Sequence, residues 1–257
     1  MLNKVLLLIW FILRPKYYLH FISLIKRKFL IRHDTLDNSK NAYKWADKNS
    51  ISYVDALKKL GIQGEFLGLD HHSILEGKKL EKKSSVKMGG SAHIHLLYDC
   101  VRLLKAQNVI ETGVAYGWSS LAILKALSQN SHGRLLSVDM PYPRQNNEPD
   151  VGIVVPQNLR KNWTLIRRPD NPGINMALKK IGGKIDICHY DSDKSWWGRH
   201  YAYPILWKAL TNGGLFISDD IQDNLYFSEF VKKYSLNYAV IKFNEKFVGL
   251  IRKEKNI

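Results

Sequence analysis

The stretch VIETGVAYGWSSLAILKAL, residues 109–127, contains the pattern that decides the predicted fold of this chain. A short apolar run ends at Glu111, a turn with two glycines four residues apart follows, and the next residues have the apolar spacing of a helix. A strand, a glycine-containing turn and a helix form the repeating unit of an open α/β sheet. Ligands of such sheets bind at the carboxyl ends of the strands, so this turn is expected to face a ligand.

The same alternation of apolar runs and helical patterns continues on both sides of this stretch. The expected strands are 108–111, 134–139, 163–168, 185–191, 214–220, 238–243 and 247–253. The last two are separated only by NEK, which is too short for a crossover and predicts an antiparallel hairpin. The sequence therefore predicts a mostly parallel seven-stranded α/β sheet that ends in this hairpin.

Residues 1–85 have a different character and are expected to form a helical N-terminal extension of the domain at 86–257. They read as helical or irregular, and they end in the charged linker EGKKLEKKSS. Residues 1–60 hold 12 Lys and Arg against 4 Asp and Glu, a large part of the formal charge of +16. A strong positive charge suggests an anionic partner such as a nucleic acid, a membrane surface or an acidic substrate.

The first 32 residues combine apolar and basic side chains. VLLLIWFIL, residues 5–13, is much shorter than the roughly 20 residues of a membrane span, and no small-residue cleavage site follows it. The next stretch, KYYLHFISLIKRKFLI, mixes aromatic and aliphatic residues with Lys and Arg, as in helices that lie on anionic membranes. We therefore expect peripheral membrane contact through residues 4–32, with a helical cap on the main domain as the alternative.

The two cysteines, Cys100 and Cys188, lie in apolar runs and are read as buried thiols of a reducing compartment. This reading places the protein in the cytoplasm, at the inner face of the membrane if the N-terminal residues bind lipid.

Carboxylates dominate the predicted strand ends, where Glu111, Asp139, Asp191 and the pair Asp219–Asp220 lie. The glycines are spaced G-x-x-x-G, without the Lys-Ser/Thr of a phosphate-binding loop or the G-x-G-x-x-G of a dinucleotide site. Carboxylates suit a cationic ligand with ribose hydroxyls and an amino group, and S-adenosylmethionine is such a ligand. Asp139 is placed to accept both ribose hydroxyls.

The motifs VIETGVAYGWSS, LLSVDM, IDICHYDSDKSWW and LTNGGLFISDDI resemble those of the methyltransferase 24 family, bacterial class I enzymes found among surface-polysaccharide and natural-product genes. The resemblance covers residues 88–252 and implies a Rossmann-like class I fold that binds S-adenosylmethionine. The residues expected to bind this cofactor are Glu111, Gly113, Gly117, Ser119, Asp139 and Asp170.

ETGVAYGWS, DSDK and SDD are also similar to metal-dependent catechol and caffeoyl-CoA O-methyltransferases. This similarity implies that Asp191, Asp219 and Asp220 hold Mg²⁺ and that Lys194, with Asp191, carries the catalysis as the base. Two positions depart from the polysaccharide-associated pattern, which more often has His where this chain has Lys194 and Tyr where it has Trp196. The ordinary alternatives are a solvated lysine at a helix start and a helix-capping pair of aspartates.

The expected reaction is O-methylation of a small-molecule, saccharide or glycolipid hydroxyl. The loop at 141–152 is read as a lid, and Trp196, Trp197 and Tyr201 allow a ring of the acceptor to stack. A nucleic-acid methyltransferase is the alternative suggested by the charge, but much of that charge lies in the N-terminal segment and no N-P-P-Y-like motif occurs. A non-catalytic cofactor-binding module on the membrane is a further alternative, and a homodimer is neither required nor excluded.

Overall fold

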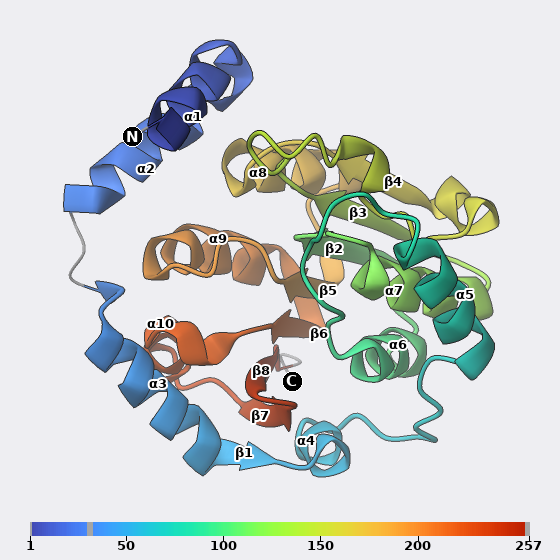
Figure 1. The fold of residues 1–257 in the computed structure, drawn as a ribbon. Coiled ribbons are helices and arrows are strands. Elements are labelled where there is room, and N and C mark those ends of the chain that lie inside the picture. The colour runs from blue at the N-terminus through green and yellow to red at the C-terminus, as the bar shows by residue number, and fades with distance from the viewer. Residues whose placement is uncertain (1, 30–32, 255–257) are drawn as a thin grey trace.

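The computed structural model describes residues 2–29 and 33–254, and its centre is one twisted sheet (Figure 1). Its strands are β1 (Ser50–Ile51), β2 (Asn108–Thr112), β3 (Arg134–Val138), β4 (Trp163–Ile166), β5 (Ile185–Tyr190), β6 (Leu210–Ser218), β7 (Tyr238–Phe243) and β8 (Lys246–Arg252). Their order across the sheet is β1-β7-β8-β6-β5-β2-β3-β4, and β8 is antiparallel to both of its neighbours. The mostly parallel sheet and its antiparallel β7–β8 hairpin confirm the predicted fold class.

The prediction of seven strands was wrong by one, because the described residues form an eight-stranded sheet. The additional strand, β1, pairs in parallel with β7, with Ser50 opposite Val240 and Ile51 opposite Ile241. A segment of two residues is too short to show a period of two, so the sequence carries no signal for it.

Helices cover both faces of the sheet. They are α1 (Leu2–Ile12), α2 (Tyr18–Phe29), α3 (Leu36–Asn49), α4 (Tyr53–Lys59), α5 (His71–Glu81), α6 (Ile94–Leu103), α7 (Trp118–Gln129), α8 (Asp170–Ile181), α9 (Trp196–Ala209) and α10 (Tyr226–Lys233). Short 3₁₀ turns lie at Pro15–Tyr17, Glu148–Asp150, Gln157–Asn162 and Ile221–Asp223.

Successive residues of each central strand enter different cores, as the period of two requires. In β2, Val109 packs with α6 and α7 on one face of the sheet, whereas Ile110 packs with α8 and α9 on the other. In β5, Ile187 packs in the core with α6 and α7, and Cys188 packs in the core with α8 and α9. Strands buried on both faces hold the loops at their carboxyl ends in fixed positions.

Residues 34–85 share the core of the residues that follow them. Leu57 of α4 belongs to the same apolar cluster as α6 and α7, and Ala46 of α3 belongs to the cluster on the other face. Buried Asp99 accepts hydrogen bonds from the Leu67 N–H at 3.1 Å and from the Gly68 N–H. The predicted boundary at residue 85 therefore marks a change in sequence pattern rather than a gap in the packing.

Helices α1 and α2 form a cluster of their own at the top of the molecule in Figure 1. Trp10, Phe11 and Tyr17 are buried against one another and against Phe21 and Met140. No single helix in the described ranges is long and apolar enough to span a membrane. The segments Val5–Ile12 and Pro15–Lys28 together reach the length and composition of a span, but they are bent by 106° at their junction.

Candidate functional site

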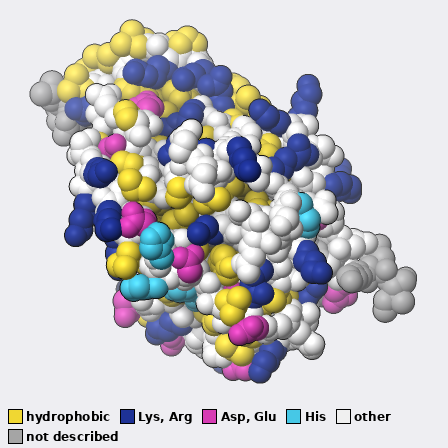
Figure 2. All heavy atoms as spheres, turned by 90° about the vertical axis from the view of Figure 1, so that its right-hand side faces the viewer, with side chains coloured by type: hydrophobic (Ala, Val, Ile, Leu, Met, Phe, Trp, Pro, Cys, Tyr) yellow, Lys and Arg dark blue, Asp and Glu magenta, His cyan; other side chains and the backbone are white. Residues whose placement is uncertain are grey.

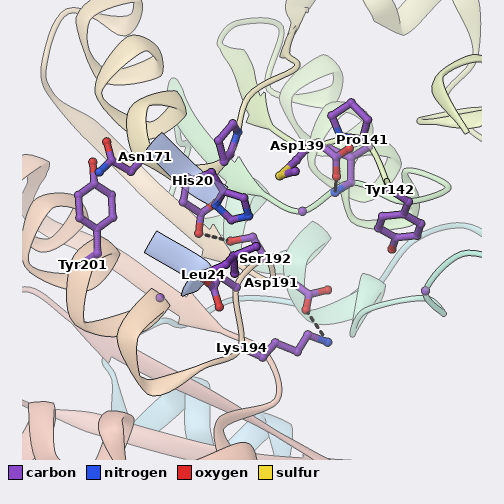
Figure 3. Close-up of a pocket in the computed structure, with 18 of the residues that line it drawn as sticks. His20, Leu24, Asp139, Pro141, Tyr142, Asn171, Asp191, Ser192, Lys194 and Tyr201 are labelled. Carbon is purple, nitrogen blue, oxygen red and sulfur yellow. Dashed lines mark hydrogen bonds and ion pairs between the residues drawn. The ribbon is translucent and has the colours of Figure 1, made fainter. Parts of the chain in front are cut away.

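A cavity of about 980 Å³ opens at the carboxyl ends of β2, β3 and β5 (Figure 3). The loops after these strands form its floor, α1 and α2 cover it, and the start of α9 closes one side. Six of the residues expected from the sequence line it together: Gly113, Ser119, Asp139, Asp170, Asp191 and Lys194. Strands that lie next to one another in the sheet therefore bring together side chains that are up to 81 residues apart in the chain.

The two glycines of the β2–α7 turn are required by the packing of the protein itself. Gly113 has φ +80°, and a Cβ atom there would lie 2.3 Å from the carbonyl oxygen of Asp191. Gly117 has φ +90°, and a Cβ atom there would lie 2.8 Å from Cα of Gly152. Gly113 lines the cavity and Gly117 does not, so the turn presents backbone to the cavity mainly around Gly113.

Asp139 lies at the end of β3, where the sequence predicted a ribose-binding acid. Its Oδ1 atom accepts the Val114 N–H at 2.9 Å, and its other oxygen pairs with the guanidinium of Arg167. Burial raises the pKa of Asp139 above its ordinary value, against the opposing attraction of Arg167. Arg167 was not expected from the sequence as a partner of Asp139, although two arginines follow the WTLI strand at the same edge of the sheet.

Asp170 begins α8 and is connected to the loop after β5. Its Oδ2 atom accepts hydrogen bonds from the Ser192 hydroxyl at 2.7 Å and from the Tyr190 hydroxyl at 3.2 Å. Burial raises the pKa of Asp170 to about 6, although both hydroxyls favour its charged form. The loops after β4 and β5 are thus joined directly beneath the cavity.

Glu111 lies under the cavity and does not line it. The carboxylate is fully buried and accepts the hydroxyls of Ser120 at 2.5 Å and Ser137 at 2.7 Å. Next to it, buried His189 lies 3.7 Å from a Glu111 oxygen and 3.5 Å from an Asp219 oxygen. These distances are long for hydrogen bonds, so the three groups form an ion-pair chain beneath the strand ends.

His189, which lies between Glu111 and Asp219, was not expected from the sequence to belong to the site. Burial alone would lower the pKa of His189, but Asp219 first and then Glu111 outweigh it and raise the pKa to about 10. The available signal was a histidine within an apolar strand, IDICHYD, because a buried titratable group requires a partner.

Lys194 lies between two carboxylates. Its Nζ atom is 3.2 Å from Oδ1 of Asp191 and forms an ion pair with Asp220. Lys246 contributes a second ammonium group 3.1 Å from Asp220. Burial alone would lower the pKa of Lys194, but the attraction of Asp191 and Asp220 together raises it. The expectation that Lys194 is the base requires a lowered pKa, so its surroundings favour the protonated ammonium instead.

The carboxylates that the resemblance implies as Mg²⁺ ligands do not converge on one point. Asp191 lines the cavity, whereas Asp219 and Asp220 do not. Asp219 faces His189, and Asp220 is held by two lysines. Over residues 2–29 and 33–254, no group of three or more His, Cys, Asp or Glu side chains is placed to hold a metal ion. The donor set therefore does not fit Mg²⁺ in this arrangement.

The N-terminal helices contribute residues to this cavity that the sequence analysis did not place there. Arg27 of α2 forms an ion pair with Asp193 and donates to the Ser195 hydroxyl at 3.2 Å. Further along the chain, the His33 ring stacks on Trp196 at 3.9 Å. The lining residues contributed by α1 and α2 are Leu7, Phe11, Leu19, His20, Ser23, Leu24, Lys26 and Arg27.

Two further expectations concerned the rim of the cavity. The loop predicted as a lid contributes Pro141, Tyr142 and Pro143 to the lining (Figure 3). Trp197 and Tyr201 of α9 also line the cavity, whereas Trp196 does not line it and stacks on His33. His71 and His72 lie on the exposed start of α5, away from the lining residues.

Comparisons with known proteins agree with this fold. Residues 110–221 match the family model of the methyltransferase 24 domain, described as a methyltransferase domain. The chain has no match among curated proteins.

Solved structures of O-methyltransferases are similar to this chain in fold. The O-methyltransferase TomG of Streptomyces achromogenes, in complex with SAM, has a TM-score of 0.58 and 16% identity over 73% of this chain and 92% of its own. An O-methyltransferase of Bacillus cereus with bound SAH has a TM-score of 0.53 and 14% identity, over 81% of this chain and 100% of its own. A putative caffeoyl-CoA O-methyltransferase of Staphylococcus aureus has a TM-score of 0.50 and 14% identity, over 71% and 93%.

The strand order, the site at the carboxyl ends of β2, β3 and β5, and the family match lead to the same conclusion. Residues 110–221 match the methyltransferase 24 domain, and the chain shares the fold of the solved O-methyltransferases to which it is similar.

Proposed function

We propose that this protein transfers the methyl group of S-adenosylmethionine to a hydroxyl group of a small molecule. The observation that carries the proposal is the cavity in which Asp139, Asp170 and Asp191 meet next to the β2–α7 turn. The similar solved structures include O-methyltransferases described with SAM and with SAH. When bound, S-adenosylmethionine supplies an electrophilic methyl group on a positively charged sulfur.

The residues of the cavity fit such a cofactor. A cavity of about 980 Å³ lies at the upper end of the range for small-molecule sites, so it has room for a cofactor and an acceptor together. Buried Asp139 is placed to accept ribose hydroxyls, and Asp170 lies on the same side. Gly113 and Ser119 would border the cofactor on the side of the β2–α7 turn, with Glu111 and Gly117 supporting that turn from below.

Asp191 and Lys194 would face the acceptor hydroxyl. The ammonium of Lys194 is a fixed positive charge in a partly buried site, where it would stabilise negative charge that develops on the acceptor oxygen. Trp197 and Tyr201 would bind a sugar or aromatic ring by stacking. This arrangement suits a saccharide or glycolipid acceptor.

The proposed reaction does not use the Mg²⁺ ion that the catechol-type pattern implies. Lys194 and Lys246 neutralise Asp220, and His189 lies against Asp219, so the positive charges that these carboxylates need come from the protein.

We also propose that α1 and α2 rest on the cytoplasmic surface of an anionic membrane. Exposed apolar side chains lie along these helices and the turn between them, among them Leu13 at 69% and Ile22 at 47% exposure. Figure 2 shows hydrophobic side chains gathered at the top of the molecule, with Lys and Arg below them. Apolar side chains next to basic ones match the interface of an anionic leaflet. Residues 30–32 of the predicted segment lie outside the described residues.

Calorimetric titration with S-adenosylhomocysteine tests the proposed function. We expect saturable binding to the full chain, weakened at least about tenfold in Asp139→Asn because the neutral amide is a weaker acceptor for ribose hydroxyls. Asp37→Asn on exposed α3 is the matched control and should bind as the wild type does. No binding by the wild type would overturn the proposal. Salt-dependent binding of nucleic acid to the same cavity would favour the nucleic-acid alternative instead.

A further inference from the structure

One face of α2 is built into the cavity. His20, Leu24 and Arg27 line it and are spaced i, i+4 and i+7, which places them on one side of a helix. Ile22 and Ile25 are exposed and do not line the cavity. In Figure 3, His20 and Leu24 lie beside Asp191 and Ser192, among the side chains of the strand ends.

Two contacts hold α2 and His20 in this position. Seven residues further along α2, Arg27 is paired with Asp193, two residues after Asp191. On the other side, the His20 ring contacts the buried ring of Phe11 of α1, with centroids 6.4 Å apart. His20 is therefore fixed near the loop after β5 rather than carried on a free helix end.

The ring of His20 is suited to accept a proton. Burial lowers the pKa of His20, and Arg27 on its own helix adds to this effect, while Asp193 from the β5–α9 loop opposes both. The net result is a neutral imidazole at neutral pH. No hydrogen bond joins His20 to another residue within the described ranges, so a ring nitrogen keeps its lone pair for a ligand.

Two other titratable groups that line the cavity, Lys194 and Asp170, are already engaged. Lys194 is held as an ammonium by Asp191 and Asp220. Asp170 accepts two hydroxyls. Transfer of a methyl group to a neutral hydroxyl releases a proton, and the site needs a group that takes it.

We propose that His20 is the catalytic base of the methyl transfer, so that the N-terminal extension completes the active site. The inference rests on the proposed function. The acceptor oxygen bonds to the methyl carbon while the carbon–sulfur bond breaks and its electron pair stays on sulfur. The hydroxyl proton moves to a ring nitrogen of His20, which later releases it to solvent. The ammonium of Lys194 stabilises the oxygen as it loses the proton.

A test that needs no acceptor uses the charge of the cofactor. S-adenosylmethionine carries a positive sulfur, and S-adenosylhomocysteine does not. If His20 lies next to the reacting sulfur, its pKa should be lower by about half a unit or more in the first complex, because like charges repel. Imidazole resonances of the full chain are titrated by NMR in both complexes, and His20→Gln identifies the His20 signal.

The His72 signal, from the exposed start of α5, is the internal control and should behave alike in the two complexes. Equal titration of His20 with either cofactor would overturn the inference. Calorimetry on the same samples separates this outcome from a failure of the proposed function, in which neither cofactor would bind.

Turnover provides the second readout, with catechol and dodecyl glucoside as probe acceptors and methyl-labelled S-adenosylmethionine. With whichever probe is methylated, His20→Gln should lower kcat about a hundredfold and leave S-adenosylhomocysteine affinity within about threefold. His72→Gln should retain the wild-type kcat. An unchanged kcat in His20→Gln would also overturn the inference. If neither probe is methylated, the NMR comparison decides alone.

Discussion

Arg27 on α2 forms an ion pair with Asp193, which lies 166 residues later in the loop after β5. The pair ties the N-terminal extension to the floor of the cavity, since Asp193 also accepts the Ser195 hydroxyl at the start of α9. A helix with exposed Ile22 and Ile25 is thereby held over the cavity.

Removal of this ion pair should loosen the cover of the cavity. In Arg27→Met we expect S-adenosylhomocysteine to dissociate about fivefold faster, with little loss of thermal stability because the pair is partly exposed. Stopped-flow fluorescence measures the dissociation rate. Lys28→Met, on the exposed side of α2, is the control and should release the ligand at the wild-type rate. A wild-type rate in Arg27→Met would show that α2 does not retain the ligand.

The buried His189 makes folding stability depend on pH. Its folded pKa of about 10 lies above the ordinary value of 6.5, so its contribution is complete below about pH 6.5. The contribution is lost as the pH rises towards 10. In His189→Gln we expect the unfolding free energy at neutral pH to fall by about 3 kcal/mol, because Glu111 and Asp219 lose their cation.

Urea unfolding at neutral pH and near pH 10 measures this difference. The loss caused by His189→Gln should be smaller at the higher pH, and the exposed control His132→Gln should change neither value. A loss that is equal at both pH values would show that His189 is not charged in the folded protein.

Lys194 should keep divalent cations out of the site. We expect no saturable Mg²⁺ binding to the wild type by calorimetry and no effect of a chelator on S-adenosylhomocysteine affinity. In Lys194→Met, Asp191 and Asp220 lose the ammonium between them, and weak Mg²⁺ binding should appear because hard oxygen ligands become available. Lys246→Met leaves Lys194 in place and serves as the control. Mg²⁺ binding by the wild type that Asp220→Asn abolishes would contradict this prediction.

Membrane contact should depend on the apolar side of α1 and α2. The double variant Leu13→Asp, Ile22→Asp should lose sedimentation with phosphatidylglycerol vesicles, because a charged group is costly in the interface. Leu36→Asp is the matched control, since Leu36 is 81% exposed on α3 and lies outside this surface. Equal binding of the wild type and both variants would show that the apolar side of α1 and α2 does not carry the membrane contact, and no binding by the wild type would contradict membrane contact. Weak binding to phosphatidylcholine vesicles would agree with a role for the basic residues.

The sequence by itself determined the sheet, its hairpin and the edge at which the acids gather. Those features depend on local periodicity: apolar runs of strand length, helical spacing between them, and an acid after each of several strands. The carboxyl ends of neighbouring parallel strands share one edge, so Asp139 and Asp191 were predicted to meet, and they line one cavity.

Only the tertiary structure decided what surrounds those acids. Lys194 meets Asp220 across 26 residues, His189 lies between Glu111 and Asp219, and α2 brings His20 from the far end of the chain. These contacts join side chains that share no period and no motif, and their charge states follow from burial and from neighbours that no local pattern specifies. The acids at the strand ends are local in origin, whereas the charges that balance them are set by packing.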